Sequence, residues 1–199
     1  MCNHYHAHLE ALRALEAWQH YLDQDFEECL SEVNSDVWPK RTALVARIND
    51  GVGTIEEMRW GVPCMVPGKR PGMKLTKHVT NVRNLASPFW RSMLATPERR
   101  CLVPFSAFAE PKIGAGRDEH WFRVKDRPVA AFAGLWRPSE EGNVFAFLTC
   151  EPNPLVAPLH PKAMPVILNE QDYEAWLTRP KDEVEVLASA FPSQLMEVK

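Results

Sequence analysis

The chain has 199 residues, of which 45% are hydrophobic and 25% are charged, and its formal net charge is −3. This length and composition predict a single globular domain with a sizeable core, and they exclude wholesale disorder. No apolar run approaches the length of about eighteen residues that a transmembrane helix needs, and the first residues lack the pattern of a secretory signal. We therefore expect a cytoplasmic protein without a membrane partner.

The cysteine and histidine patterns give little sign of a metal. The five cysteines are scattered, and no two of them form a CxxC pair, so neither a disulfide framework nor a zinc site is indicated. The HYHAH segment at residues 4–8 offers alternating histidines, but no acidic or cysteine ligand follows at finger-like spacing. We expect no metal and no cofactor.

One cysteine stands directly after the initiator methionine. If Met1 is removed, Cys2 carries an α-amine and a thiol on the same residue. Such a pair can attack an aldehyde first with the amine and then with the thiolate, which closes a five-membered thiazolidine ring. The alternative is that Cys2 belongs to a frayed terminus and has no function.

The segment after the histidines has the spacing of helices. Four leucines predict a helix over residues 8–22: Leu9, Leu12, Leu15 and Leu22. Residues 23–34 predict a second, acidic helix. Residues 8–35 would then form a helical region packed on the rest of the domain.

From Arg41 onward, short β-like runs are separated by glycine and proline. The runs are TALVARI, TIEEMRW, RCLVPFSAF, HWFRV, PVAAFAGLW and NVFAFLTC. Between two of them, VPGKRPGMK predicts a loop. Helices are predicted after Ser87, with Pro88 in the first position, and after Asn169. The fold class is therefore α+β: one compact domain with a curved, mostly antiparallel, barrel-like sheet and peripheral helices.

Basic residues are concentrated in a segment that contains no aspartate or glutamate. They are Arg59, Lys69, Arg70, Lys74, Lys77, Arg83 and Arg91. On an otherwise acidic chain this segment predicts either a positive surface for a polyanion or a solvated loop. Trp60, Phe89 and Trp90 could stack on bases or belong to the core, and for Trp90 we favour the core. Because no helix-turn-helix, finger or basic-zipper pattern occurs, single-stranded DNA fits better than duplex.

Three further motifs hold candidate catalytic residues. Glu110 ends the apolar stretch RRCLVPFSAFAEP, where burial would raise the pKa of its carboxyl. His160 lies between a proline-rich turn and a β-like run, and Asn81 and Arg83 would share one face of a strand. Each motif alone is also compatible with a structural role.

The order and wording of these motifs resemble the SRAP (SOS-response-associated peptidase) family. The matching segments span almost the whole chain in the family order. They are MC at the start, MRWGVP at 58–63, TNVRN at 80–84, RRCLVPFSAFAEP at 99–111, AFAGLWRP at 131–138 and LTCEPNPLVAPLHPKAMPVIL at 148–168. The resemblance implies one SRAP-like domain over residues 1–199, with a positively charged DNA channel that leads to the N-terminal cysteine.

The resemblance also implies a function in the response to DNA damage, namely covalent capture of abasic sites in single-stranded DNA by the N-terminal cysteine. The catalytic set it implies is Cys2, Asn81, Glu110 and His160, with Cys2 as the nucleophile and the last two moving protons. The expected DNA-binding residues are Arg59, Trp60, Lys69, Arg70, Lys74, Lys77, Arg83 and Lys162. The expected partner is single-stranded DNA that contains abasic sites, bound by a monomer that joins the nucleoid when it is on DNA.

The chain departs from the family pattern at several positions. Asn3 and His4 stand where the family has Gly-Arg, Leu85 stands where an acidic residue is common, and Pro111 replaces a tryptophan after the glutamate. The HPKAMP segment is one residue longer than the usual histidine motif and offers Lys162. These differences concern the DNA contacts more than the chemistry.

Two other classes of function stay open. A cysteine peptidase would use Cys2 as nucleophile and His160 as base, and removal of its own leading residue would be compatible with DNA capture. A non-catalytic module for single-stranded DNA would need the basic segment but not Cys2.

Overall fold

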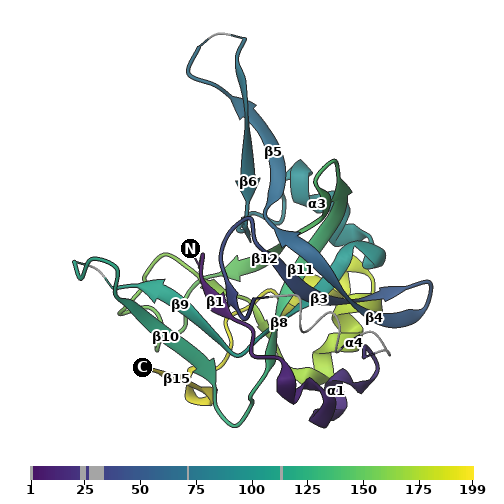
Figure 1. Cartoon of the computed structure of the whole chain (residues 1–199), viewed down its shortest axis with the longest axis vertical. Coiled ribbons are helices and arrows are strands. Elements are labelled where there is room, and N and C mark those ends of the chain that lie inside the picture. Colours follow the sequence, from purple (N-terminus) through teal and green to yellow (C-terminus); the bar gives the residue numbers. More distant parts are fainter. Residues whose placement is uncertain (1, 23–25, 27–33, 71, 113) are drawn as a thin grey trace.

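Five strands close into a barrel in the computed structural model, which describes residues 2–22, 26, 34–70, 72–112 and 114–199 (Figure 1). In order around the barrel they are β12 (Gly142–Cys150), β4 (Val52–Trp60), β3 (Thr42–Asn49), β8 (Arg100–Phe105) and β11 (Ala130–Ser139). β11 pairs with β12 and closes the circle. Only the pairing of β12 with β4 is parallel among these five, so the predicted barrel-like, mostly antiparallel sheet is confirmed.

Shorter strands extend this barrel, and a second sheet lies beside it. β7 (Asn81–Val82) and β13 (Met164–Pro165) pair with β12, and β14 (Ile167–Leu168) pairs with β11. The second sheet has the order β15 (Met196–Val198), β10 (Glu119–Val124), β9 (Ala107–Pro111), β1 (Tyr5–His6) and β2 (Asp36–Val37). Because only Ser106 separates β8 from β9, the chain passes directly from the barrel into this sheet.

Aromatic side chains join the barrel to the second sheet. Phe132 stacks on Phe105 with a centroid distance of 3.8 Å, and both are buried. Tyr5 of β1 reaches the same cluster, with its ring 5.2 Å from Trp60 and 5.8 Å from Phe132. The buried Tyr5 therefore anchors the N-terminal strand in the core.

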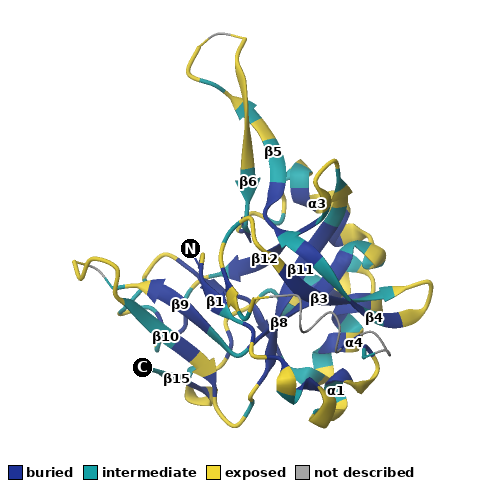
Figure 2. Cartoon of the chain, in the orientation of Figure 1, coloured by how far each residue is buried: buried dark blue, intermediate teal, exposed yellow. Residues whose placement is uncertain are grey.

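A two-stranded ribbon of β5 (Val62–Pro67) and β6 (Lys74–Val79) projects from the body (Figure 1). Most of its outer part is exposed (Figure 2). The predicted loop is confirmed only for the turn between Pro67 and Lys74, because both flanks of VPGKRPGMK are strands. The sequence did not predict these strands, since a ribbon with two solvated faces carries no apolar alternation to signal it.

The helices are short and lie on the outside of the sheets (Figure 1). The predicted helix after Ser87 is confirmed as α3 (Pro88–Ala95), in which Trp90 is buried as we expected. The helix predicted after Asn169 begins as a 3₁₀ turn, Glu170–Asp172, and continues as α4 (Tyr173–Thr178). Further short elements are α5 (Lys181–Val184) and the 3₁₀ turns Pro97–Arg99, Glu185–Leu187 and Ser193–Leu195.

The N-terminal helical region differs from its prediction. A 3₁₀ turn, Glu10–Ala14, and α1 (Glu16–Gln19) replace the continuous helix expected over residues 8–22. The break falls at Leu15, whose extended backbone (ψ 115°) ends the first turn. Apart from the two positions 26 and 34, the predicted acidic helix lies outside the described residues. None of the helices in the described ranges is long and apolar enough to cross a membrane.

Candidate functional site

Strand pairing places Cys2 inside the protein. Tyr5 and His6 of β1 pair with Phe108 and Ala107 of β9, and the backbone N–H of Ala109 donates to the carbonyl of His4 at 2.9 Å. This antiparallel register carries the residues before β1 toward the end of β9. Cys2 is fully buried, and its thiol donates to the His4 carbonyl at 3.5 Å. Cys2 therefore does not belong to a frayed terminus, which was the alternative considered from the sequence.

Asn81 holds the backbone of Cys2. It is the first residue of β7, which pairs with β12, and only 7% of it is exposed. Its Nδ2 donates to the Cys2 carbonyl at 2.8 Å and to Thr80 Oγ1 at the same distance. A neutral amide at this point fixes the position of Cys2 without adding charge.

Glu110 and His160 face each other near Cys2. Glu110 lies on β9, and its side chain has no exposed surface. Oε2 of Glu110 is 3.3 Å from Nε2 of His160, while Nδ1 of His160 lies 2.8 Å from the carbonyl of Ala163. Because a carbonyl can only accept, Nδ1 carries a proton, and Nε2 of the neutral ring is then the nitrogen that can accept one.

Burial shifts the pKa values of all three titratable groups. It raises the pKa of the Glu110 carboxyl to about 7 and lowers the pKa of His160. It also raises the pKa of the Cys2 thiol well above its ordinary value, and the negative charge of Glu110 adds to this effect. These directions favour a protonated carboxyl beside a neutral imidazole and an un-ionised thiol. The site therefore holds a proton that can be given away and a base that can take one.

The four residues proposed as catalytic from the sequence thus come together. Asn81 contacts Cys2, the charge of Glu110 acts on the Cys2 thiol, and His160 contacts Glu110. They come from four separate segments of the chain, so their contacts could not be predicted from local sequence patterns.

Six of the seven basic residues in the segment from Arg59 to Arg91 form two groups. The first is exposed on the projecting ribbon: Lys69, Arg70, Lys74 and Lys77. In the second group, Arg59 pairs with Glu141 at 3.2 Å, and Arg83 bonds to Glu151 and to the carbonyl of Lys162. Folding therefore brings acids from later segments to Arg59 and Arg83, although the segment from Arg59 to Arg91 contains no acid of its own.

Trp60 requires a correction. It was expected to contact DNA, but it is fully buried, its ring stacks on Phe147 at 5.1 Å, and its Nε1 donates to the carbonyl of Thr80. A side chain without exposed surface cannot stack on a base. Trp60 instead supports the backbone next to Asn81.

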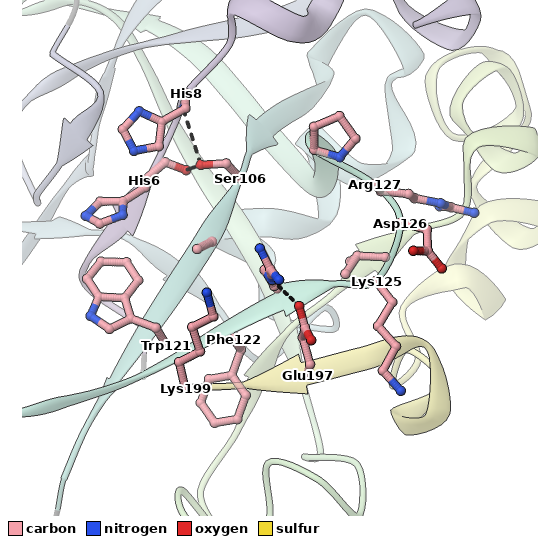
Figure 3. A pocket seen from close by; sticks show the side chains of 14 residues that line it. His6, His8, Ser106, Trp121, Phe122, Lys125, Asp126, Arg127, Glu197 and Lys199 are labelled. Atoms are coloured by element: carbon pink, nitrogen blue, oxygen red, sulfur yellow. Dashed lines mark hydrogen bonds and ion pairs between the residues drawn. The ribbon is translucent and has the colours of Figure 1, made fainter.

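A polar cluster that we did not predict from the sequence lies on the face of β1 opposite Tyr5. Both ring nitrogens of His4 face carboxylates, with Nε2 2.5 Å from Asp36 Oδ1 and Nδ1 2.6 Å from Glu119 Oε2. His6 joins the cluster and also lines a neighbouring cavity of about 890 Å³, together with His8, Trp121 and Arg123 (Figure 3). Only the alternating histidines signalled this cluster, because both carboxylates lie far away in the sequence.

The SOS response associated peptidase (SRAP) family model matches residues 1–199 of the chain. The chain belongs to the SRAP family. Membership in this family supports a role associated with DNA damage and an interaction with DNA. No curated protein matches the chain significantly.

Solved structures share the SRAP fold. A protein from Bordetella bronchiseptica is 24% identical over 99% of this chain and 98% of its own, with a TM-score of 0.75. One from Bacteroides thetaiotaomicron is 22% identical over 99% of this chain and 90% of its own, with a TM-score of 0.78. A phage-related protein from Bordetella bronchiseptica is 18% identical over 100% and 93%, with a TM-score of 0.65. At these identities the likeness concerns the fold.

The raised pKa of Glu110 predicts that folding stability depends on pH. The folded protein binds this proton more tightly than the unfolded chain, in which the pKa of a glutamate is about 4.3. The stabilisation is fully present below that pH and is lost, on the order of 3 kcal/mol, as the pH rises toward 7. Glu110→Gln should remove this loss, which urea unfolding from about pH 5 to 7.5 would measure.

The control for this experiment is Glu140→Gln, at an exposed carboxyl, which should keep the wild-type dependence on pH. Parallel stability curves for the wild type and Glu110→Gln would show that Glu110 ionises as freely in the folded protein as in the unfolded chain.

Proposed function

We propose that the protein captures abasic sites in single-stranded DNA by forming a thiazolidine between Cys2 and the aldehyde of the opened sugar. The observation that carries this proposal is the placement of Cys2 beside Glu110, whose carboxyl is buried and can be protonated at neutral pH. Asn81 holds Cys2 in this position by a hydrogen bond to the Cys2 carbonyl. The reaction requires removal of Met1, which converts Cys2 into a terminal aminothiol.

In the first step the amine adds to the aldehyde carbon. A terminal amine has a pKa of about 8, so a useful fraction is unprotonated at neutral pH. The carbinolamine then loses its hydroxyl as water and leaves an iminium. This loss needs a proton donor, and the carboxyl of Glu110, with a pKa of about 7, provides one at neutral pH.

In the second step the sulfur adds to the iminium carbon and closes the ring. The thiol proton must leave as the C–S bond forms, because burial keeps the thiol un-ionised. The Glu110 carboxylate produced in the first step accepts this proton, so the pair with His160 returns to its starting state. Aldehyde, amine and thiol thus give thiazolidine and one water, without an oxidant or a reductant.

The ribbon of β5 and β6 supplies the DNA-binding part of the proposal. Its second strand leads through Thr80 directly to Asn81, so the basic side chains of Lys74 and Lys77 stand on a strand that ends at the site. Phosphates along a single strand would bind these cations while the abasic sugar lies at Cys2.

The geometry favours capture over a cysteine peptidase. A peptidase base must bond to the nucleophilic thiol, whereas Nε2 of His160 faces the Glu110 carboxyl and the Cys2 thiol donates to a backbone carbonyl. A non-catalytic module would not need Glu110 to be buried at a cost to stability. Self-removal of Met1 is compatible with this proposal.

The direct test is incubation with single-stranded DNA that carries one abasic site, followed by a denaturing gel. The wild type should give a heat-stable adduct, and Cys2→Ala should give none, although both bind the DNA. Cys2→Ser should form only an imine that borohydride can trap, because closure through oxygen is less favourable. Intact mass should show a chain without Met1.

Two results would contradict capture by the aminothiol. One is a heat-stable adduct in Cys2→Ser, and the other is a wild-type protein that retains Met1 and still crosslinks fully. A non-covalent shift alone would instead support the binding module.

Glu110 and His160 should change the rate of capture and not the affinity for DNA. Removing a general acid or base costs about a hundredfold to ten-thousandfold in rate. Under saturating DNA, Glu110→Gln should therefore crosslink slowly in a single turnover, while its affinity for intact single strands stays near the wild-type value. His160→Ala should behave similarly. The matched control is Glu140→Gln, at an exposed carboxyl outside this pair. Wild-type rates in both variants would mean that Cys2 works unaided.

Affinity for single-stranded DNA should fall steeply with salt, although the protein is net acidic. If about three to five cations meet phosphates, the log–log slope is about −2 to −3.5. Lys74→Ala combined with Lys77→Ala should make it less steep by about 1.4, because each lost contact contributes about 0.7. A matched pair at exposed or half-exposed sites elsewhere, Lys125→Ala with Lys181→Ala, should leave it unchanged. Equal slopes in both double variants would remove the ribbon from the DNA interface.

A further inference from the structure

Two histidines and a carboxylate converge on one face of β1. His6 lies directly opposite Asp36 in the pairing of β1 with β2. Asp36 Oδ1 is 3.4 Å from Nε2 of His6 and 2.5 Å from Nε2 of His4. The three possible ligand atoms all lie within 4.8 Å of one another. We propose that His4, His6 and Asp36 bind a divalent transition-metal ion, with Zn²⁺ as the preferred ion.

The spacing of the ligand atoms suits such an ion. Zinc–nitrogen and zinc–oxygen bonds of about 2.0–2.1 Å in a tetrahedron separate neighbouring ligands by about 3.3 Å. The contact of His6 with Asp36 already has this separation. The contact of His4 with Asp36 is shorter, as expected when a proton occupies the place of the ion, and it must open by less than about 1 Å. Metal binding would displace the proton from Nε2 of His4.

A second carboxylate orients the ligand His4. Glu119 Oε2 accepts from Nδ1 of His4 at 2.6 Å, which leaves Nε2 as the nitrogen that faces Asp36 and His6. A metal-bound histidine almost always donates its other N–H to a carboxylate, a carbonyl or water. The cluster therefore contains the supporting hydrogen bond of a metal site as well as its ligands.

Two indole rings hold the imidazoles in place. Trp38 stacks on His4 with a centroid distance of 3.7 Å, and Trp121 stacks on His6 at 3.9 Å. The His4 side chain is 8% exposed, whereas that of Asp36 is 49% exposed. Both imidazoles are thus fixed before an ion arrives, and the ion can enter from the solvent on the Asp36 side. This open side leaves a fourth position for water.

The chemistry of the donors selects the class of ion. Imidazole nitrogens favour zinc and other late transition metals, whereas magnesium and calcium require oxygen ligands. Binding would link β1 to β2 through an ion whose ligand His4 lies two residues after Cys2. The proposal can be tested without abasic-site capture, because its ligand side chains lie on the other face of β1 and do not belong to the pair of Glu110 and His160.

The experiment uses the full-length protein without a tag and titrates it with Zn²⁺ against a chromophoric chelator, and with Co²⁺ by visible absorption. We expect one equivalent to bind. His6→Ala and Asp36→Asn should each weaken binding by about a hundredfold or more, and Glu119→Gln by about tenfold to a hundredfold. Zn²⁺ at about a hundred times its dissociation constant should raise the Tm by about 5 to 10 °C in the wild type and not in Asp36→Asn.

Two control variants test whether Zn²⁺ binds at a site other than the proposed cluster. His8→Ala removes an exposed histidine from the same strand face but outside the cluster, so it should bind Zn²⁺ as the wild type does. Cys2→Ser should also keep the full equivalent, which would exclude chelation by the terminal aminothiol. The proposal is overturned if the wild type does not compete with the chelator, if His6→Ala and Asp36→Asn bind normally, or if His8→Ala or Cys2→Ser abolishes binding.

Discussion

The pairing of β1 with β9 is the constraint on which the site depends. β1 has only two residues in regular strand geometry, yet its register brings the N-terminal cysteine to the strand that carries Glu110. Tyr5 fixes this register, because its buried ring contacts the aromatic core, while His4 and His6 point to the other face of the sheet. A slip by one residue would exchange these faces and put a histidine in the aromatic core. Cys2 is thus positioned by the packing of a nearby residue, and the N-terminal segment becomes part of the core.

The spatial distribution of charge differs from its distribution along the sequence. Arg59 and Arg83 belong to a segment that contains no acid, residues 59–91, but the fold pairs them with Glu141 and Glu151. Arg83 also bonds to the carbonyl of Lys162, so it supports the loop that carries His160. The other cations are exposed on the ribbon of β5 and β6, which projects away from the body (Figure 1). The cations that remain available for the proposed DNA strand therefore lie mainly on β5 and β6, and Arg83 combines a structural role with its position near the site.

Local patterns in the sequence predicted the parts of the molecule that local physics determines. The apolar runs of the barrel were recognisable because they are buried, and the burial of Glu110 followed from its apolar neighbours. The break at Leu15 was not predictable, since the leucine spacing remains helical on both sides of it. The contact of Asn81 with Cys2 and the approach of Asp36 to His4 depend on strand order, which a single sequence does not encode locally.

His4 stands where the resemblance to the family predicts an arginine, and its contacts determine the electrostatics on this face of β1. Both ring nitrogens of His4 face carboxylates, so the negative charges of Asp36 and Glu119 gather on this face. A divalent ion bound there would offset this negative charge. The same His4 accepts the thiol of Cys2 and the N–H of Ala109 through its carbonyl, so its ring and its backbone connect the cluster to the nucleophile. An ion on this face would therefore weaken the repulsion of phosphate and also restrain the peptide that positions Cys2. The charge on this face of β1 would therefore depend on what the cluster binds.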